Sequence, residues 1–171
     1  QMAGIPSVLV DFNAFLKNNS YAGKANKITL PKVVMKTLDF DGAGIGGTVK
    51  RSVGKLEAME MEVTVSDYSK DVMGMVGSRS SRNEVVTFRG ALERDGEIKT
   101  VIVRASGFWR ELEFNEWAPG SEATNKVVID VEYIELEVDN KKMLEIDKLN
   151  NKFVGADGKD RNEEIRNALG Q

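Results

Sequence analysis

The sequence contains no cysteine, no histidine and only three prolines among its 171 residues. The absence of cysteine excludes disulfide bonds, thiolate nucleophiles and cysteine-ligated zinc or iron–sulfur clusters. The absence of histidine excludes Ser-His-Asp and Cys-His catalysis and haem iron held by a histidine. No run of 18 apolar residues occurs, so we expect no membrane-spanning helix. These absences remove many enzyme and membrane classes before any motif is considered.

The remaining composition is that of an ordinary folded domain. Hydrophobic residues make up 41% of the chain and charged residues 30%, which is too apolar for a disordered protein. The length predicts one domain over residues 1–171. The net charge is −3 and the charges are scattered, whereas a nucleic-acid-binding domain carries a basic patch.

Apolar and polar residues alternate with a period of two along much of the chain, which is typical of half-buried β-strands. The pattern is clearest in residues 56–66, where Glu60 and Glu62 lie opposite the apolar face. The same pattern predicts strands over 84–94, 98–105, 108–114, 127–138 and 142–146, with an Asp95-Gly96 turn joining the first two. The sequence therefore predicts a mainly β, antiparallel sandwich or barrel-like fold.

Residues 127–138 change phase in their middle. Up to Tyr133 the apolar residues share one parity, opposite Asp130 and Glu132, and from Ile134 onward they take the other parity. A one-residue slip exchanges the two faces of a strand. We therefore expect a β-bulge or a change of packing partner near Tyr133-Ile134, in a long strand that serves two environments.

Residues 108–114 alternate with one interruption at Arg110. The parity places Phe108, Leu112 and Phe114 on one face and Trp109, Glu111 and Glu113 on the other. We interpret Trp109 and Trp117 as packing anchors rather than as ligand-stacking residues.

Helices and loops are few. A short helix is predicted over 69–75, capped by Ser69, and another over 160–168 in the C-terminal segment 156–171, capped by Asp160. A glycine-rich extended loop is predicted over 39–55, and a connector over 115–124.

No motif makes a positive case for catalysis, a cofactor or a metal. Residues 42–47 are rich in glycine, but the βαβ context of a dinucleotide site and the Gly-Lys-Ser/Thr of a Walker loop are both missing. Carboxylate pairs such as Glu60 with Glu62, or Asp130 with Glu132, lie on wet strand faces without an aromatic sugar platform. Residues 157–160 lack the ligand spacing of a calcium loop.

The acidic strand faces admit two interpretations. In a monomeric sandwich they face solvent. In a closed ring of several copies they would line a wide, wet lumen, and closure would also remove exposed sheet edges. An acidic lumen repels DNA phosphates and so lets a strand pass without binding.

Several short motifs, in order along almost the whole chain, resemble the major tail tube proteins of contractile-tailed phages and the tube proteins of R-type bacteriocins. They include Asn13, Phe15 and Gly23 near the start, Leu30-Pro31-Lys32, the glycines of 42–47, Glu145-Ile146-Asp147 and Asp160-Arg161. The chain departs from this pattern at residues 17–19, where the family has Asp-Gly, at Asn140, where it has Gly, and at the C-terminal Gln171. Residues 68–94 match poorly.

The resemblance implies a protomer with a small outer helix, six copies of which form a ring with a continuous inner β-barrel. Rings would stack into a tube inside a contractile sheath, and the lumen would conduct DNA in a phage. The acidic residues expected to face the lumen are Glu60, Glu62, Asp130 and Glu132. The loop expected to contact adjacent subunits or rings consists of Asp41, Gly42, Ala43, Gly44, Ile45, Gly46, Gly47 and Thr48.

The partners implied by the resemblance are further copies of the chain, the sheath, baseplate and terminator proteins and the tape measure protein, with DNA passing transiently. The implied location is the phage tail or bacteriocin particle, assembled in the bacterial cytoplasm, with no membrane insertion. Alternatives are a type VI secretion tube and a monomeric β-sandwich ligand-binding module. An enzyme with a carboxylate pair and a membrane pore, which would need aromatic girdles, rank lower.

Overall fold

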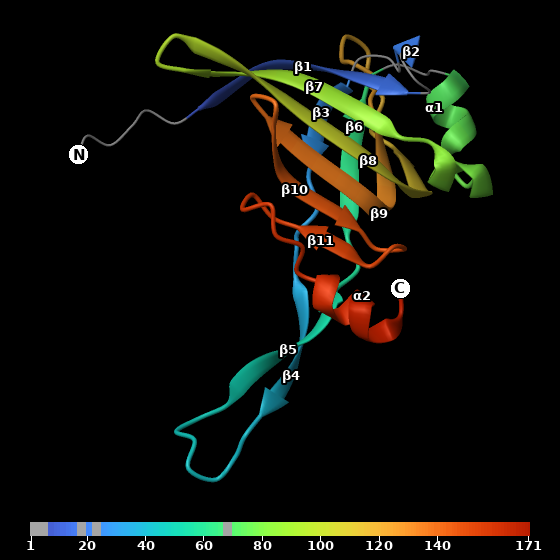
Figure 1. Cartoon of the computed structure of the whole chain (residues 1–171). Coiled ribbons are helices and arrows are strands. Elements are labelled where there is room, and N and C mark those ends of the chain that lie inside the picture. Colours follow the sequence, from blue (N-terminus) through green and yellow to red (C-terminus); the bar gives the residue numbers. More distant parts are fainter. Residues whose placement is uncertain (1–6, 17–19, 22–24, 67–69) are drawn as a thin grey trace.

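The computed structural model describes residues 7–16, 20–21, 25–66 and 70–171. Over these residues the chain forms eleven strands, two α-helices and one 3-10 helix (Figure 1). The strands are β1 (Val8–Leu16), β2 (Ser20–Tyr21), β3 (Ala25–Thr29), β4 (Met35–Phe40), β5 (Val49–Leu56), β6 (Glu60–Val65), β7 (Val86–Arg94), β8 (Glu97–Phe114), β9 (Asn125–Val138), β10 (Lys141–Asp147) and β11 (Lys152–Val154). The helices are α1 (Lys70–Met75), η1 (Arg79–Asn83) and α2 (Glu163–Leu169). The predicted mainly β fold is confirmed.

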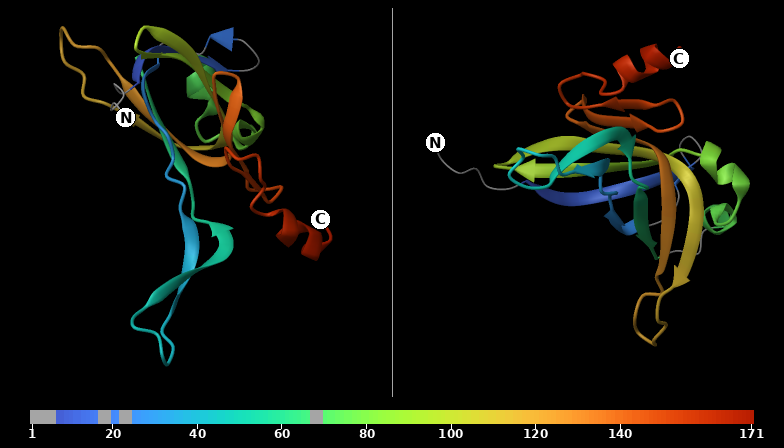
Figure 2. Two further views of the ribbon diagram at one scale, coloured as in Figure 1. Left: turned by 60° about the vertical axis from the view of Figure 1, so that its left-hand side comes forward. Right: turned by 90° about the horizontal axis from the view of Figure 1, so that it is seen from below.

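Nine strands form one antiparallel sheet in the order β11-β10-β9-β8-β7-β1-β2, and β6 with β3 branches from β9. The sheet curls until β3 lies against β1, which gives the protomer its barrel-like form (Figure 2). The inside of the curl holds a continuous apolar core. Its most deeply buried side chains are Leu16, Met59, Met61, Val127, Ile129 and Ile146.

Strand β9 divides one of its edges between two partners. β8 pairs along its whole length, whereas β6 pairs with residues 125–130 and β10 with residues 133–138. Glu132 falls between these halves and is skipped in the pairing with β8, where Ser106 faces Tyr133 and the next residue faces Val131. The predicted bulge and change of partner are confirmed, with the bulge at Glu132.

The predicted strands 98–105 and 108–114 are one continuous strand, β8, with a second bulge at Arg110. Because of this bulge, Trp109 and Leu112 both face the core, and Trp109 is only 4% exposed. The expectation that Trp109 shares a wet face with the acidic residues is therefore wrong, and its interpretation as a packing anchor is correct. An extra residue shifts the parity of everything after it.

The predicted loop 39–55 is for the most part a β-hairpin. β4 and β5 pair from Phe40 with Val49 back toward Met35 with Leu56, so that only residues 41–48 form the loop. The hairpin extends far from the rest of the molecule in Figure 1 and in the left-hand view of Figure 2. It forms a separate two-stranded sheet rather than joining the main one.

The helices are short and peripheral, as the sequence indicates. α1 buries Val72 and Met75 against the core, while its predicted cap Ser69 lies outside the described residues. α2 begins three residues later than predicted, after Asn162, and ends at Gly170 in the left-handed conformation. Strands β1, β2, β3, β4, β5 and β11 were not predicted.

We expect the β8–β9 bulge to depend on Gly107. A Cβ atom there would overlap the carbonyl group of Asp130 and press on Cα of Val131, which are backbone atoms that cannot rotate away. Gly107→Ala should lower the free energy of unfolding by about 3 kcal/mol in urea denaturation. Gly46→Ala is the matched control, because an added Cβ meets nothing within 4 Å there, and it should change stability by less than about 0.5 kcal/mol. Equal effects of the two substitutions would contradict this role.

Candidate assembly surfaces

The outer face of β6, β9 and β8 carries the acidic residues that the sequence singles out. Glu60 lies directly opposite Asp130, and Glu62 lies opposite Val128, which in turn faces Glu111 of β8. These side chains point away from the core, because their neighbours Met61 and Ile129 are buried in it. The structure therefore brings three of the four predicted acids, Glu60, Glu62 and Asp130, to one face.

Arg110 lies between two of these acids. Its Nη2 atom is 2.6 Å from Oε1 of Glu60, and its Nε atom is 2.9 and 3.0 Å from the two carboxylate oxygens of Asp130. The hydrogen bond and the attraction of Asp130 raise the pKa of Arg110 above its ordinary value. Sequence reasoning noted Arg110 only as an interruption, and its position at a bulge explains why: alternation does not predict where a bulged side chain points.

Glu132 is separated from the other three acids. Its carboxylate is 3.4 Å from Nε of Arg82 in η1, and the Arg82 guanidinium lies 5.7 Å from the ring centre of Phe108. Glu132 is the residue skipped in the pairing with β8, and it contacts η1 rather than the Glu60–Asp130 pair.

The projecting hairpin exposes apolar side chains that an isolated two-stranded ribbon cannot bury. Leu38 is 66% exposed, Phe40 52% and Val53 42%. The loop at its tip is held locally by a hydrogen bond from Oγ1 of Thr48 to Oδ1 of Asp41 at 2.8 Å. A hairpin of two strands is marginally stable at best without packing against another element. These residues therefore form an apolar surface that no other part of the described chain covers.

At the root of the hairpin, α2 and β11 lie beside β5 (Figure 1). A groove between them is lined by apolar side chains that include Val53, Leu56, Phe153, Ile165 and Leu169. Gly54 has a positive φ of 76°, and an added Cβ would come within 3.1 Å of Ile165. The apolar residues Ile165 and Leu169 of α2 thus lie against the root of the hairpin.

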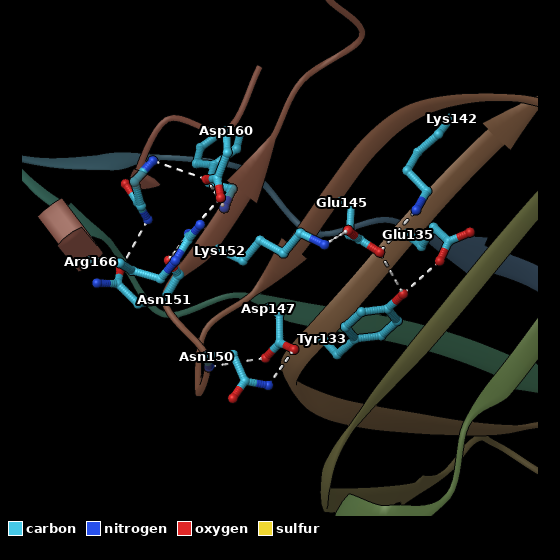
Figure 3. A network of polar contacts seen from close by, with 12 residues as sticks. Tyr133, Glu135, Lys142, Glu145, Asp147, Asn150, Asn151, Lys152, Asp160 and Arg166 are labelled. Carbon is cyan, nitrogen blue, oxygen red and sulfur yellow. Dashed lines mark hydrogen bonds and ion pairs between the residues drawn. The ribbon is translucent and has the colours of Figure 1, made fainter. Parts of the chain in front are cut away.

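Behind this groove, a network of polar contacts joins β9, β10 and β11 (Figure 3). Glu145 faces Glu135 across the strands, and the Tyr133 hydroxyl donates to both carboxylates, at 2.5 Å to Glu135 and 3.2 Å to Glu145. Lys152 and Lys142 approach the carboxylate of Glu145 at 2.7 and 3.1 Å. These donors compensate the repulsion between two acids that lie directly opposite one another.

The network shifts the pKa of each of its acidic groups. Hydrogen bonding from Lys152 lowers the pKa of Glu145 against the opposing effect of burial. Burial acts to raise the pKa of Glu135, but hydrogen bonds and the nearby Lys142 and Arg104 outweigh it and lower the pKa. Burial and the adjacent carboxylates raise the pKa of Tyr133.

The other motif residues also hold strand ends together. Asp147 accepts hydrogen bonds from the backbone and side chain of Asn150, and Asp160 accepts from the backbone N–H groups of Phe153 and Asn162. Arg161 donates to Asp157 at 3.0 Å. Ile146 is fully buried. These four motif positions are explained by local structure.

The remaining predicted positions form an exposed linker. Leu30, Pro31 and Lys32 lie between β3 and β4, where Leu30 is 41% exposed and Pro31 is half-buried. The structure describes no cluster of three or more acidic side chains suited to a metal ion within residues 7–16, 20–21, 25–66 and 70–171. In the same part of the chain, no helix has the length and apolar character needed to cross a membrane.

Chains of several solved structures share this fold. A chain of the sheath–tube complex of the extracellular contractile injection system PVC matches with a TM-score of 0.56 and 13% identity, over 77% of this chain and 91% of that one. A chain of the PVC sheath/tube terminator matches with a TM-score of 0.55 and 13% identity, over 80% and 98%. A chain of the tube-terminating cap of the anti-feeding prophage matches with a TM-score of 0.54 and 10% identity, over 80% of this chain and 95% of that one. The chain thus shares its fold with these chains of contractile injection systems and of the anti-feeding prophage cap.

Sequence comparison identifies the family. The family described as phage tail tube protein FII matches residues 6–170. The tail tube protein of Escherichia phage P2 is 30% identical over 170 residues, which cover 97% of this chain and 98% of that protein. The major tail tube protein of Serratia phage KSP20 is 30% identical over 152 residues, or 85% of each chain. The chain belongs to the phage tail tube protein FII family, and its role is that of a structural tail tube protein.

The acidic network of β9 and β10 should make stability depend on pH. Because the folded pKa values of Glu135 and Glu145 are lowered, their contribution is complete above the ordinary glutamate pKa and is lost as the pH falls through the folded values. We expect the free energy of unfolding, from urea denaturation, to fall between about pH 5 and pH 3.

Glu145→Gln should lower stability by about 2 kcal/mol at neutral pH and flatten this pH dependence, since it removes the titrating negative charge that pairs with both lysines. Glu97→Gln, at the exposed β7–β8 turn, is the control and should leave the pH dependence unchanged. An unaltered slope in Glu145→Gln would show that the network does not couple to folding.

Proposed function

We propose that this chain builds the inner tube of a contractile phage tail or of a headless, bacteriocin-like particle as stacked hexameric rings. The observation that carries the proposal is a family match along residues 6–170, together with a protomer that leaves an apolar hairpin projecting and an acidic sheet face uncovered. A subunit of this form gains its missing packing from neighbouring copies, and a closed ring removes its exposed sheet edges.

The outer face of β6 and β9 is proposed to line the lumen. Support comes from the shared outward direction of Glu60, Glu62 and Asp130, and Glu132 is included less directly because it contacts Arg82. A wall of this sign repels DNA phosphates, so that a DNA strand passes without specific binding. No chemical step is needed for this role, and we propose no enzymatic activity.

The β4–β5 hairpin and its loop, residues 41–48, are proposed to contact an adjacent ring. Support comes from the hairpin's reach and from its exposed Leu38 and Phe40. The proposed partners are sheath and terminator proteins, because chains of a sheath–tube complex and of a sheath/tube terminator share this fold, and also baseplate and tape measure proteins. The proposed setting is the tail particle, assembled in the bacterial cytoplasm.

Negative-stain electron microscopy of the purified chain tests the central proposal. Hollow rods or discs are expected, because the uncovered surfaces favour self-association. A type VI-like tube would give similar rods, so neighbouring genes separate those two functions. Single small particles at all concentrations would favour the monomeric ligand-binding module instead.

A reconstruction of the rods should place Glu60, Glu62 and Asp130 on the wall of the central channel. The physical reason is that the opposite face of the same strands is already filled by the core. The readout is the position of these strands in the cryo-electron microscopy density. Carboxylates that point toward the outer surface of the rod would refute the lumen assignment.

Shortening the hairpin tip should block rod growth without unfolding the protomer. Replacement of residues 41–48 by Asn-Gly closes the hairpin directly between Phe40 and Val49 with a favourable two-residue turn. We expect a normal circular dichroism spectrum and no rods by electron microscopy. The matched control replaces Asp95-Gly96 by Asn-Gly in the β7–β8 hairpin, which should leave rods intact. Rods of ordinary length from the shortened variant would argue against a contact between rings.

A further inference from the structure

The outer face of β6, β9 and β8 contains cations as well as acids. Arg110 lies on β8 and Lys126 on the neighbouring strand β9. Lys27 lies on β3, which pairs with β6, opposite Thr64. Nζ of Lys126 is 2.9 Å from the Glu113 carboxylate, and its pKa is raised by Glu113 and the nearby Glu62 and Glu111. Arg110 and Lys126 are therefore both paired with carboxylates of the same face.

Arg110 is the more completely held of the two. The fork of its guanidinium, Nε and Nη2, is taken up by Asp130 and Glu60 from two different strands. A guanidinium fork is also the group that binds phosphate oxygens in pairs. The Nε–Nη2 edge, one of the two edges with which a guanidinium can bind a phosphate, is thus occupied by the two carboxylates.

The stability of the protomer does not explain this arrangement well. The Arg110 side chain is 41% exposed and its partners are 56% and 40% exposed, a setting in which ion pairs contribute little. The two acids also lie directly opposite one another, which disfavours strand pairing unless a cation is placed between them. Arg110 permits the acidic pair, and the acidic pair in turn covers Arg110.

We propose that Arg110 is a latent phosphate-binding site that Glu60 and Asp130 keep closed. The ligand class is the phosphate backbone of a nucleic acid, and the two carboxylates determine that it does not bind. The face remains acidic around the site, with Glu62, Glu111 and Glu113 nearby. This inference rests on the proposed function for its biological meaning, since a lumen needs a wall that does not retain passing DNA.

The experiment opens the site and measures binding. The double substitution Glu60→Gln and Asp130→Asn removes both charges but keeps the size of each side chain. Binding of a short fluorescein-labelled deoxythymidine oligonucleotide to the purified full-length chain is followed by fluorescence anisotropy at low salt. We expect the double variant to bind at least about tenfold more tightly than the unchanged chain, and added salt to abolish the gain.

Two further variants separate the site from net charge. Glu163→Gln with Glu164→Gln makes the same change in charge on α2, away from this face, and should give little gain. Adding Arg110→Gln to the double variant should return binding to the level of the unchanged chain. A double variant that binds no more tightly, an equal gain from the α2 control, or a gain that survives loss of Arg110 would each overturn the proposal.

Folding and assembly are checked separately. Circular dichroism reports the fold of each variant. If the double variant is unfolded, the single substitution Glu60→Gln, which leaves Asp130 in place, is tested instead, and we expect a smaller gain in oligonucleotide affinity from it. No gain from either single substitution, Glu60→Gln or Asp130→Asn, in folded protein would also overturn the proposal. Electron microscopy of the unchanged chain tests the tube itself, so absence of rods would refute the proposed function while leaving the anisotropy result to decide on Arg110.

Discussion

A strand has only two edges, and this limit organises the protomer around β9. β8 occupies one edge completely, so β6 and β10 must share the other, and the bulge at Glu132 marks where one gives way to the other. The half paired with β6 produces the exposed acidic face. The half paired with β10 produces the polar network that supports β11 and the C-terminal helix. Two surfaces with different properties thus arise from one strand.

In each half of β9, an acidic residue lies directly opposite another acidic residue on the neighbouring strand, and different cations or donors offset the repulsion in the two halves. Glu60 opposes Asp130 on the β6 side, and Glu135 opposes Glu145 on the β10 side. In the first pair a single guanidinium from β8 lies between exposed acids. In the second, lysines and a tyrosine hydroxyl surround acids that are nearly buried, and the pKa values of both fall. The Glu60–Asp130 pair remains exposed to solvent, whereas the Glu135–Glu145 pair contributes to the stability of the fold.

Sequence patterns predicted the long strands well, because alternation and a phase change are direct records of which face is buried. They predicted the bulge of β9 from the switch at Tyr133-Ile134, and the tail tube family from short motifs in order. They missed the orientation of Trp109, because the bulge at Arg110 shifts parity without a signal of its own. They missed the hairpin as well, since its strands are mostly exposed beyond their root and its apolar residues follow no clear alternation. The clamp on Arg110 joins three strands that are distant in sequence, so only the structure brings it together.

The uncovered hairpin has a consequence for how such a protein polymerises. Ordering a two-stranded ribbon in water has little to offset its entropy, so a lone subunit gains nothing from holding it in place. When a hairpin docks on an already assembled surface, the apolar contacts offset the entropy lost by ordering it. When two free subunits meet, both hairpins must be ordered at the same time. If subunits add through this hairpin, growth has a nucleation barrier, so that even above the critical concentration subunits assemble only slowly until a template presents the first surface.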